Sequence, residues 1–296
     1  MKRDFLSLTD LSAEEYESLF RRAAELKASR HRGDVIRTLA GRTLLLLFEK
    51  HSTRTRLSFE AAIGQLGGSA ITLPMQDSQI SRGESLTDTG AVASRYVDAI
   101  MYRTFGDDRL RELARAATVP VINGLSDGGH PVQLLADLFT VQERFGSLRG
   151  KVVAWVGDGA SNMARSWIEA APIFGFTLRI SAPEGFRPVR GTGFDLVGDA
   201  REAVHGADVV TTDVWISMGQ EKEAAARRKA FAGYCVDEAL LQQAKPSAIV
   251  LHCLPAHRGE EISAGVIDGP QSAVLDEAEN RLHVQKALLE ALILHR

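Results

Sequence analysis

The feature that most constrains the fold is a series of short apolar runs that alternate with longer, helix-like segments. Residues 43–48 (TLLLLF) form a continuous apolar run, which is typical of a strand buried on both faces of a parallel sheet. Further strands are predicted at 70–73, 99–102 and 119–122, and a second series is predicted at 152–156, 178–181, 209–212 and 248–252. Two successive series predict an α/β protein with two doubly wound parallel-sheet domains.

Helices are predicted between these strands. The first is capped by Thr9 or Asp10 and ends near residue 29, and others span 54–66, 127–145 and 276–295. The charged run QEKEAAARRKA, within residues 213–235, is most simply a solvated helix. We place the first domain at residues 1–130, with 276–296 packing back on it, and the second domain at 131–275.

Composition and charge exclude several classes of function. Of 296 residues, 45% are hydrophobic and 25% charged, as in ordinary globular proteins, and 35 Lys and Arg against 38 Asp and Glu give no basic excess for nucleic acid. The apolar run at 44–48 is far shorter than the roughly 20 residues of a membrane span. The start, MKRDFLSLTD, resembles neither a signal nor a transit peptide, and Cys235 and Cys253 cannot form a disulfide framework. We therefore expect a cytoplasmic protein without nucleic-acid or membrane partners.

The stretch Ser52-Thr53-Arg54-Thr55 lies between a predicted buried strand and a predicted helix. Free N–H groups at a helix N-terminus, together with hydroxyls and a guanidinium, would suit a phosphate group. An ordinary Ser/Thr cap with surface arginines explains the stretch equally well. It is not a P-loop, because the glycines of that motif are missing.

A second motif, His130-Pro131-Val132-Gln133, follows a glycine-containing turn. Proline suits the first turn of a helix, which places His130 just before that helix. A neutral imidazole and an amide at this position could donate hydrogen bonds to a polarised carbonyl. Spacing alone favours a capping histidine and an exposed Gln133.

Asp213 and Cys253 each follow an apolar strand of the second series. An acid at the carboxyl end of a strand faces the crevice in which α/β domains bind ligands. Asp213, with the loop of Ser217 and Met218, could hold an ammonium and a carboxylate together, or it could belong to a turn around a buried Trp. Cys253 could be a nucleophile, although a buried structural cysteine is commoner.

The segment Gly157-Asp158-Gly159 suggests half of a dinucleotide-binding fingerprint, and Asn162 stands where the third glycine is required. This makes the NAD interpretation weak. 

Three other polar residues are weaker candidates. Arg103 lies just beyond a predicted strand, Gln79 lies in a polar loop, and Arg281 is one turn from Glu277, with which it could form a surface pair. Each by itself is more often structural or solvated than functional.

Taken together, the motifs resemble the aspartate/ornithine carbamoyltransferases, and most closely the ornithine carbamoyltransferases. The matching stretches, in family order, are FEKHSTRTRLSFE, MYRTF, INGLSDGGHPVQ, VGDGASNMARS, DVWISMGQE, LHCLPAHRGEEI and AENRLHVQKAL. STRT and HPxQ are shared with the aspartate type, whereas SMG and HCLP mark the ornithine type. These matches are spread over nearly the whole chain.

The resemblance implies transfer of the carbamoyl group of carbamoyl phosphate to the δ-amine of L-ornithine in a cleft between the domains, giving L-citrulline and phosphate. It implies arginine biosynthesis, no metal or organic cofactor, and a homotrimer or an assembly of trimers. By the resemblance, the donor would be bound by Ser52, Thr53, Arg54, Thr55, Gln79, Arg103, His130, Gln133, Cys253, Leu254 and Arg281, with Gln79 reaching a neighbouring subunit's site. The acceptor would be bound by Asn162, Asp213, Ser217 and Met218.

The same resemblance implies catalytic roles for Arg54, Arg103, His130, Cys253 and Asp213. In particular, Thr55, Arg103 and His130 would polarise the carbamoyl oxygen, and Gln133 would hold the carbamoyl NH₂. We expect the loops at 75–85 and 217–219 to be mobile without ligand. Three alternatives remain: another acceptor such as putrescine or an acylated ornithine, an NAD-dependent oxidoreductase, and a non-catalytic relative.

Overall fold

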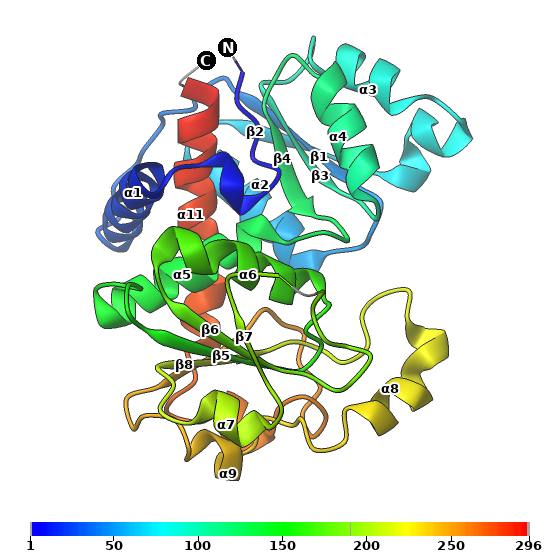
Figure 1. Ribbon diagram of the computed structural model, residues 1–296. Coiled ribbons are helices and arrows are strands. Elements are labelled where there is room, and N and C mark those ends of the chain that lie inside the picture. The colour runs from blue at the N-terminus through cyan, green and yellow to red at the C-terminus, as the bar shows by residue number, and fades with distance from the viewer. Residues whose placement is uncertain (1, 190, 295–296) are drawn as a thin grey trace. The chain divides into compact units, whose positions relative to one another are not determined.

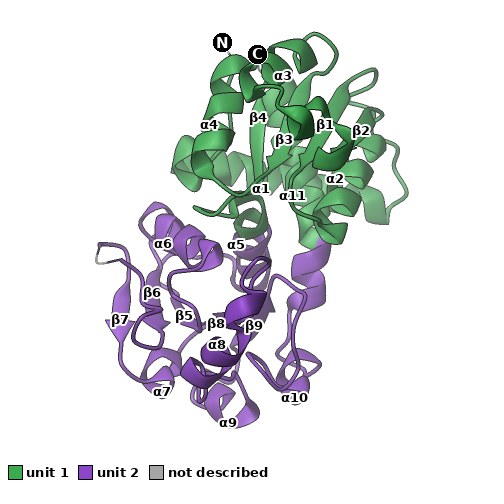
Figure 2. Cartoon of the chain, turned by 90° about the vertical axis from the view of Figure 1, so that its right-hand side faces the viewer, with its two compact units in different colours: residues 1–135, 280–296 green, residues 136–279 purple. Residues whose placement is uncertain are grey.

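The chain divides into two compact units in the computed structural model, which describes residues 2–189 and 191–294. Unit 1 comprises Met1–Leu135 and Asn280–Arg296, and unit 2 comprises Ala136–Glu279 (Figure 2). Among the described residues, each unit contains one sheet, with four strands in unit 1 and five in unit 2. All paired strands named here run parallel, which confirms the predicted pair of parallel-sheet α/β folds.

The sheet of unit 1 has the strand order β2-β1-β3-β4. Its strands are β1 (Thr43–Phe48), β2 (Ser69–Pro74), β3 (Ala99–Arg103) and β4 (Val121–Leu125). Its helical elements are η1 (Leu8–Asp10), α1 (Ala13–His31), α2 (Thr53–Gln65), η2 (Met75–Asp77), η3 (Gln79–Arg82), α3 (Leu86–Ala93) and α4 (Asp107–Ala116). Helices α3 and α4 pack against each other on the side of the sheet away from α1 (Figure 1).

Strand β1 illustrates why the apolar run forms a central strand. It pairs with β2 on one edge and with β3 on the other, and five of its six residues are buried. Leu47 packs in a core with Ile100, Leu113 and Val121. Full burial of one such side chain contributes about 1.5–3 kcal/mol, so a polar residue at these positions would be strongly disfavoured.

The sheet of unit 2 has the order β7-β6-β5-β8-β9. Its strands are β5 (Val152–Val156), β6 (Thr177–Ser181), β7 (Asp195–Val197), β8 (Val209–Thr212) and β9 (Ile249–His252). Its helical elements are α6 (Asn162–Phe174), α7 (Ala200–Val204), η4 (Glu221–Glu223), α8 (Ala224–Ala230), α9 (Glu238–Leu241) and α10 (Ala264–Ile267). Helices α5 (Pro131–Phe145) and α11 (Val274–Leu294) each contribute residues to both units.

Several predicted helix ends are wrong. Ser12, rather than Thr9 or Asp10, caps α1, because its hydroxyl accepts from the Glu15 N–H while Glu15 bonds back to the Ser12 N–H. Helix α5 begins at Pro131 rather than at 127, since the preceding turn is closed by a bond from the Ser126 N–H to the Gly129 carbonyl.

Other predicted bounds shift by a few residues. Helix α2 begins at residue 53 and ends at 65, and the strand expected at 119–122 lies at 121–125. Helix α11 begins at 274, and the predicted end at residue 295 lies outside the described residues. Strand β7 was not predicted, because its exposed edge carries no apolar run.

The charged run after residue 219 is not a single solvated helix. It forms the short η4 and α8, and within it Arg227 is buried, with only 5% of its surface exposed. Among the described residues, no helix is both long enough and apolar enough to cross a membrane.

Candidate functional site

Three neighbouring strands of unit 1 end in the polar residues that the sequence singled out. The sheet order places β1 beside β3 and β3 beside β4, and parallel strands end at the same edge of a sheet. The loop after β1 leads to Ser52, Arg103 is the last residue of β3, and the loop after β4 leads to His130. The fold therefore gathers the first group of candidates from three separate parts of the sequence.

The segment Ser52-Thr53-Arg54-Thr55 forms the start of α2. Ser52 is the N-cap, and its hydroxyl accepts from the Thr55 N–H at 3.2 Å. The N-terminal N–H groups of any α-helix lack carbonyl partners in the preceding turn, so they can bond to caps or ligands. Ser52 and Thr53 also line a cavity of about 500 Å³, which is open beside the ends of β1 and β2.

Arg281 reaches this segment from α11, more than two hundred residues later in the chain. Its guanidinium donates to the Thr55 hydroxyl at 3.0 Å and also to the side-chain oxygen of Gln133. All three side chains are buried. The surface pair of Arg281 with Glu277 and the exposed Gln133 that spacing favoured are therefore both wrong.

His130 lies immediately before α5 and is 6% exposed. Desolvation lowers its pKa well below the usual value, and the positive charges of Arg281, Arg103 and Arg54 lower it further. The imidazole is consequently neutral at physiological pH and can act as a hydrogen-bond donor. Positive charge near a neutral hydrogen-bond donor is a combination that can bind an anion with a polarisable oxygen.

Glu49 connects the end of β1 to the end of β3 by hydrogen bonds. Its buried carboxylate accepts from Tyr102, from the Thr104 hydroxyl at 2.6 Å and from Arg109, and its N–H donates to the Arg103 carbonyl at 2.8 Å. Burial alone would raise the pKa of Glu49, but these hydrogen bonds outweigh it and leave the pKa below its ordinary value. The sequence analysis missed Glu49, although it lies within the matched stretch FEKHSTRT.

Gln79 does not lie at the end of β1, β3 or β4, as the first group of candidates does. It is the first residue of the short η3, and it is exposed. The cavity beside β1 is lined by Met75 and Gln76 from the same loop. 

Unit 2 repeats the arrangement with opposite charge. Strands β5, β8 and β9 are neighbours, and Asn162, Asp213 and Cys253 follow them in that order. Asn162 is the first residue of α6, behind the cap Ser161. The second group of candidates therefore also lies along the carboxyl edge of a parallel sheet.

Asp213 and Cys253 contact each other directly. The Cys253 thiol donates to Asp213 Oδ1 at 3.2 Å, and the Val214 N–H donates to the same oxygen at 2.8 Å. Desolvation raises the pKa of Cys253 well above its usual value, and the negative charges of Asp213 and Glu277 raise it further. Cys253 is therefore a neutral thiol that donates a hydrogen bond, which argues against a thiolate nucleophile.

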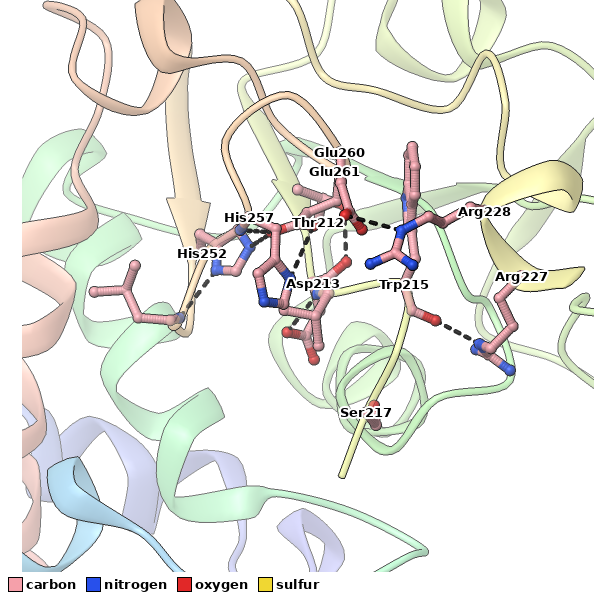
Figure 3. Close-up of polar contacts among 12 residues, drawn as sticks. Thr212, Asp213, Trp215, Ser217, Arg227, Arg228, His252, His257, Glu260 and Glu261 are labelled. Atoms are coloured by element: carbon pink, nitrogen blue, oxygen red, sulfur yellow. Dashed lines mark hydrogen bonds and ion pairs between the residues drawn. The ribbon is translucent and has the colours of Figure 1, made fainter. Parts of the chain in front are cut away.

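His252 and Glu261 support the loop that carries Cys253 (Figure 3). His252 Nε2 lies 3.2 Å from Glu261 Oε1, and His252 Nδ1 accepts from the Leu254 N–H at 2.9 Å. Because Nδ1 accepts, Nε2 carries the proton and donates to Glu261. Leu254 has φ of 58°, a left-handed conformation that is unusual for leucine and is held here by this bond.

Glu261 is fully buried and was not among the predicted site residues. Burial alone would raise its pKa, but hydrogen bonds from His252 and from the His257 N–H outweigh it and leave the pKa below the ordinary value. It is therefore a carboxylate. The stretch HCLPAHRGEEI contained it, but nothing in the spacing distinguished it from its neighbour Glu260.

Ser217 and Met218 lie in the loop between β8 and η4. The Ser217 N–H donates to the Gln220 side chain at 3.0 Å, and Met218 is 50% exposed. Trp215, two residues earlier, is buried as the turn interpretation expected. The loop thus has a buried base and an exposed tip.

Two groups of side chains among the described residues offer metal-ligand atoms within 4.8 Å of one another. They are Asp213 with His252 and Cys253, and His257 with Glu260 and Glu261. In the first group the ligand atoms already bond to one another or to neighbouring protein groups. Hydrogen bonding within the protein explains this group without a metal ion.

The two halves of the chain match the models of two domains of one protein family. Residues 3–143 match the aspartate/ornithine carbamoyltransferase carbamoyl-P binding domain, and residues 149–292 match the Asp/Orn binding domain of the same family. Proteins named ornithine carbamoyltransferase are 55% identical in Halorhodospira halophila, over 99% of both chains, and 53% identical in Chromobacterium violaceum, over 99% of this chain and 98% of the relative.

Solved structures give the same result. The ornithine carbamoyltransferase of Pyrococcus furiosus has a TM-score of 0.94 at 47% identity, covering 99% of this chain and 97% of the other. That of Burkholderia thailandensis has a TM-score of 0.92 at 49% identity, covering 99% of each chain. The chain belongs to the aspartate/ornithine carbamoyltransferase family.

Proposed function

We propose that this chain is an ornithine carbamoyltransferase, which transfers the carbamoyl group of carbamoyl phosphate to the δ-amine of L-ornithine and releases L-citrulline and phosphate. The observation that carries this proposal is the full-length likeness, at 53–55% identity, to proteins of that name. The charge of the two groups of residues supports it, since the donor is an anion and the acceptor is a diamino acid.

In unit 1, we assign the phosphate of the donor to Ser52, Thr53, Arg54 and Thr55 at the start of α2. The N-terminus of a helix, with a hydroxyl-bearing cap and a guanidinium, is well suited to a doubly charged oxyanion. Arg103 supports the phosphate and the carbonyl. 

Arg103, Thr55 and the neutral His130 would donate to the carbamoyl oxygen, which gains negative charge when the amine attacks. Removal of one such donor typically lowers kcat by a factor of about 10²–10³. Gln133, which is held by Arg281, would bind the carbamoyl NH₂. The carbonyl groups of Cys253 and Leu254 would complete the recognition of that NH₂.

In unit 2, we assign the α-ammonium of the acceptor to Asp213, and its carboxylate to Asn162 and the loop of Ser217 and Met218. A carboxylate that must pair with an ammonium is well placed beside a neutral thiol, because the Cys253 S–H orients Asp213 without adding charge. 

The δ-amine must lose a proton before it attacks. An amine with a pKa near ~10.4 is neutral in only about one molecule in a thousand at physiological pH, which costs roughly 4 kcal/mol. Orientation of two bound substrates can offset this cost, since it can contribute ~7–11 kcal/mol. Transfer therefore requires that the carbonyl carbon bound by the first group of residues meets the amine bound by the second.

An acceptor panel tests the proposed function. L-Ornithine, putrescine and N-acetylornithine are each incubated with carbamoyl phosphate, and the ureido product is measured. We expect the highest kcat/KM for L-ornithine, because Asp213 and the 217–218 loop offer partners to both α-groups. Faster turnover of putrescine would refute the assignment.

We also propose that the protein acts as a homotrimer in cytoplasmic arginine biosynthesis, with Gln79 reaching a neighbouring subunit's site. The exposed position of Gln79 agrees with a contact to another subunit. The two free cysteines agree with a reducing compartment such as the cytoplasm. Mixing an inactive Gln79→Ala protein with an inactive Arg54→Ala protein tests it. If Gln79 acts across subunits, mixed trimers contain some complete sites and regain activity, whereas no recovery would contradict it.

A further inference from the structure

The segment Gly157-Asp158-Gly159 has no role in the proposed reaction, yet Asp158 is buried and fully engaged. Asp158 Oδ1 accepts from the Ala160 N–H at 2.9 Å, and its backbone carbonyl accepts from Trp155 Nε1 at 3.2 Å. Its other side-chain oxygen, Oδ2, accepts from Arg227. The aspartate thus bonds to both its own loop and a distant helix.

Arg227 is a charged residue held in an aromatic enclosure. Its guanidinium carbon lies 4.7 Å from the centre of the Phe186 ring and 5.6 Å from that of Phe231. It donates to Asp158. It also donates to the backbone carbonyl of Trp215, as Figure 3 shows. Burying the two charges costs desolvation free energy, which their hydrogen bonds to defined partners offset.

The two ends of this pair lie beside two different parts of the proposed acceptor site. Asp158 organises the loop that ends at Asn162, the first residue of α6. Arg227 holds Trp215, which lies two residues before Ser217. The pair therefore connects the Asn162 segment to the base of the Ser217 loop.

Within the described part of the chain, the side-chain hydrogen bonds at the tip of that loop are local. The Ser217 N–H bonds to the nearby Gln220 side chain, the Gly219 N–H bonds to Glu221 at 3.0 Å, and Met218 is half exposed. These bonds span only a few residues of the chain. The longer-range contacts near this loop are made at its buried base, by Arg227 with Trp215.

We propose that Asp158 and Arg227 form a positioning pair that fixes the spacing between Asn162 and the Ser217–Met218 loop and so aligns the groups that bind the acceptor's α-carboxylate. This inference rests on the proposed function. Neither residue touches the reacting atoms.

The test compares Arg227→Met with Arg227→Lys and with the matched control Arg228→Met. The control removes the adjacent arginine, which is exposed and pairs with Glu260 at 3.0 Å. We measure KM for each substrate, kcat, and the inhibition constant of L-norvaline, which keeps the α-ammonium and α-carboxylate but lacks the δ-amine.

For Arg227→Met we expect KM for L-ornithine and the L-norvaline inhibition constant both to rise about 10- to 100-fold, because misaligned groups lose a charge-assisted hydrogen bond to the α-carboxylate. We expect KM for carbamoyl phosphate to stay within about twofold and kcat within about threefold. Arg227→Lys should lie between, because it keeps the charge but lacks the planar fork. Arg228→Met should resemble the wild type.

The double variant Asp158→Asn with Arg227→Met tests the coupling. Because both residues act through one contact, we expect its KM for L-ornithine to be no higher than that of Arg227→Met alone. If Arg227→Met fails to fold, Arg227→Lys and Asp158→Asn still test the same KM separation.

Two results would overturn the inference. One is an unchanged KM for L-ornithine in folded Arg227→Met and Arg227→Lys. The other is a parallel rise of both KM values with a lower melting temperature, which indicates a purely structural role. In either case wild-type protein still makes citrulline, whereas failure of the proposed function would show as wild-type protein that makes none.

Discussion

The two units use the same sheet edge to build opposite electrostatic environments. In unit 1, His130 is surrounded by the guanidiniums of Arg54, Arg103 and Arg281. In unit 2, Cys253 is surrounded by carboxylates, with Asp213 in direct contact and Glu277 nearby. The comparison teaches that one fold, used twice, can carry mainly positive or mainly negative groups at its strand ends, depending on which residues stand there.

The comparison also explains two uncharged hydrogen-bond donors. Desolvation and nearby positive charge keep the His130 imidazole neutral, while desolvation and nearby negative charge keep the Cys253 thiol protonated. Opposite fields therefore have the same chemical result, a neutral donor in each unit. 

We expect the largest effect from removing one of the three guanidiniums near His130. Arg54→Ala should lower kcat/KM by several orders of magnitude while the fold persists, because the proposed phosphate partner and a positive charge beside His130 are lost. Arg56→Ala is the matched control, since Arg56 lies on the same helix and pairs with Glu60 on the surface. Steady-state citrulline formation and circular dichroism measure both. A loss of less than tenfold would place the phosphate elsewhere.

We expect the next largest effect from replacing the carboxyl group of Asp213. Asp213→Asn should raise KM for L-ornithine about 100-fold and leave KM for carbamoyl phosphate nearly unchanged, since a charged hydrogen bond contributes roughly 1.5–3 kcal/mol. Asp195→Asn, at an exposed strand residue, provides the control. If both KM values rise equally, the division of labour between the units is wrong.

Substitutions of Cys253 should have a smaller effect, and they distinguish a hydrogen-bonding thiol from a nucleophile. Cys253→Ser keeps a donor to Asp213, so we expect activity within about tenfold of wild type, and Cys253→Ala should lose more. Iodoacetamide should alkylate Cys253 slowly at pH 7, because the pKa of the thiol is raised. Complete loss of activity in Cys253→Ser, with rapid alkylation of wild type, would favour a covalent role.

The smallest effect concerns stability and pH. The pKa of His130 is well below 6.5 in the folded chain, so below about pH 6.5 the unfolded chain binds a proton that the folded chain does not. The free energy of unfolding should therefore fall by up to about 1.4 kcal/mol per pH unit below 6.5. Urea unfolding of wild type and His130→Gln between pH 5 and 8 measures this, and identical pH slopes would show that His130 does not contribute.

Much of the fold was readable from the sequence because buried parallel strands are marked by continuous apolar runs. The run at residues 43–48 became β1, and the run at 152–156 became β5. Strand β7 has no such run, because it lies at a sheet edge and its residues are largely exposed. Edge strands of this kind leave little signal in a single sequence.

The site was readable in part. The motifs at strand ends could be grouped, because topology brings neighbouring strands to one edge. Burial could not be read, however: Arg281 and Arg227 both carry surface-like sequence signals, and each is buried against partners distant in the chain. Glu49 and Glu261 were missed for the same reason, because their hydrogen bonds come from the tertiary structure.

A crystal structure with a bisubstrate analogue, in which a phosphonate is joined to an ornithine moiety, tests the central claim most directly. We expect the phosphonate to contact Arg54 and the α-ammonium to contact Asp213. A complex in which the analogue binds tightly but touches neither residue would contradict the assignment of the donor to unit 1 and the acceptor to unit 2.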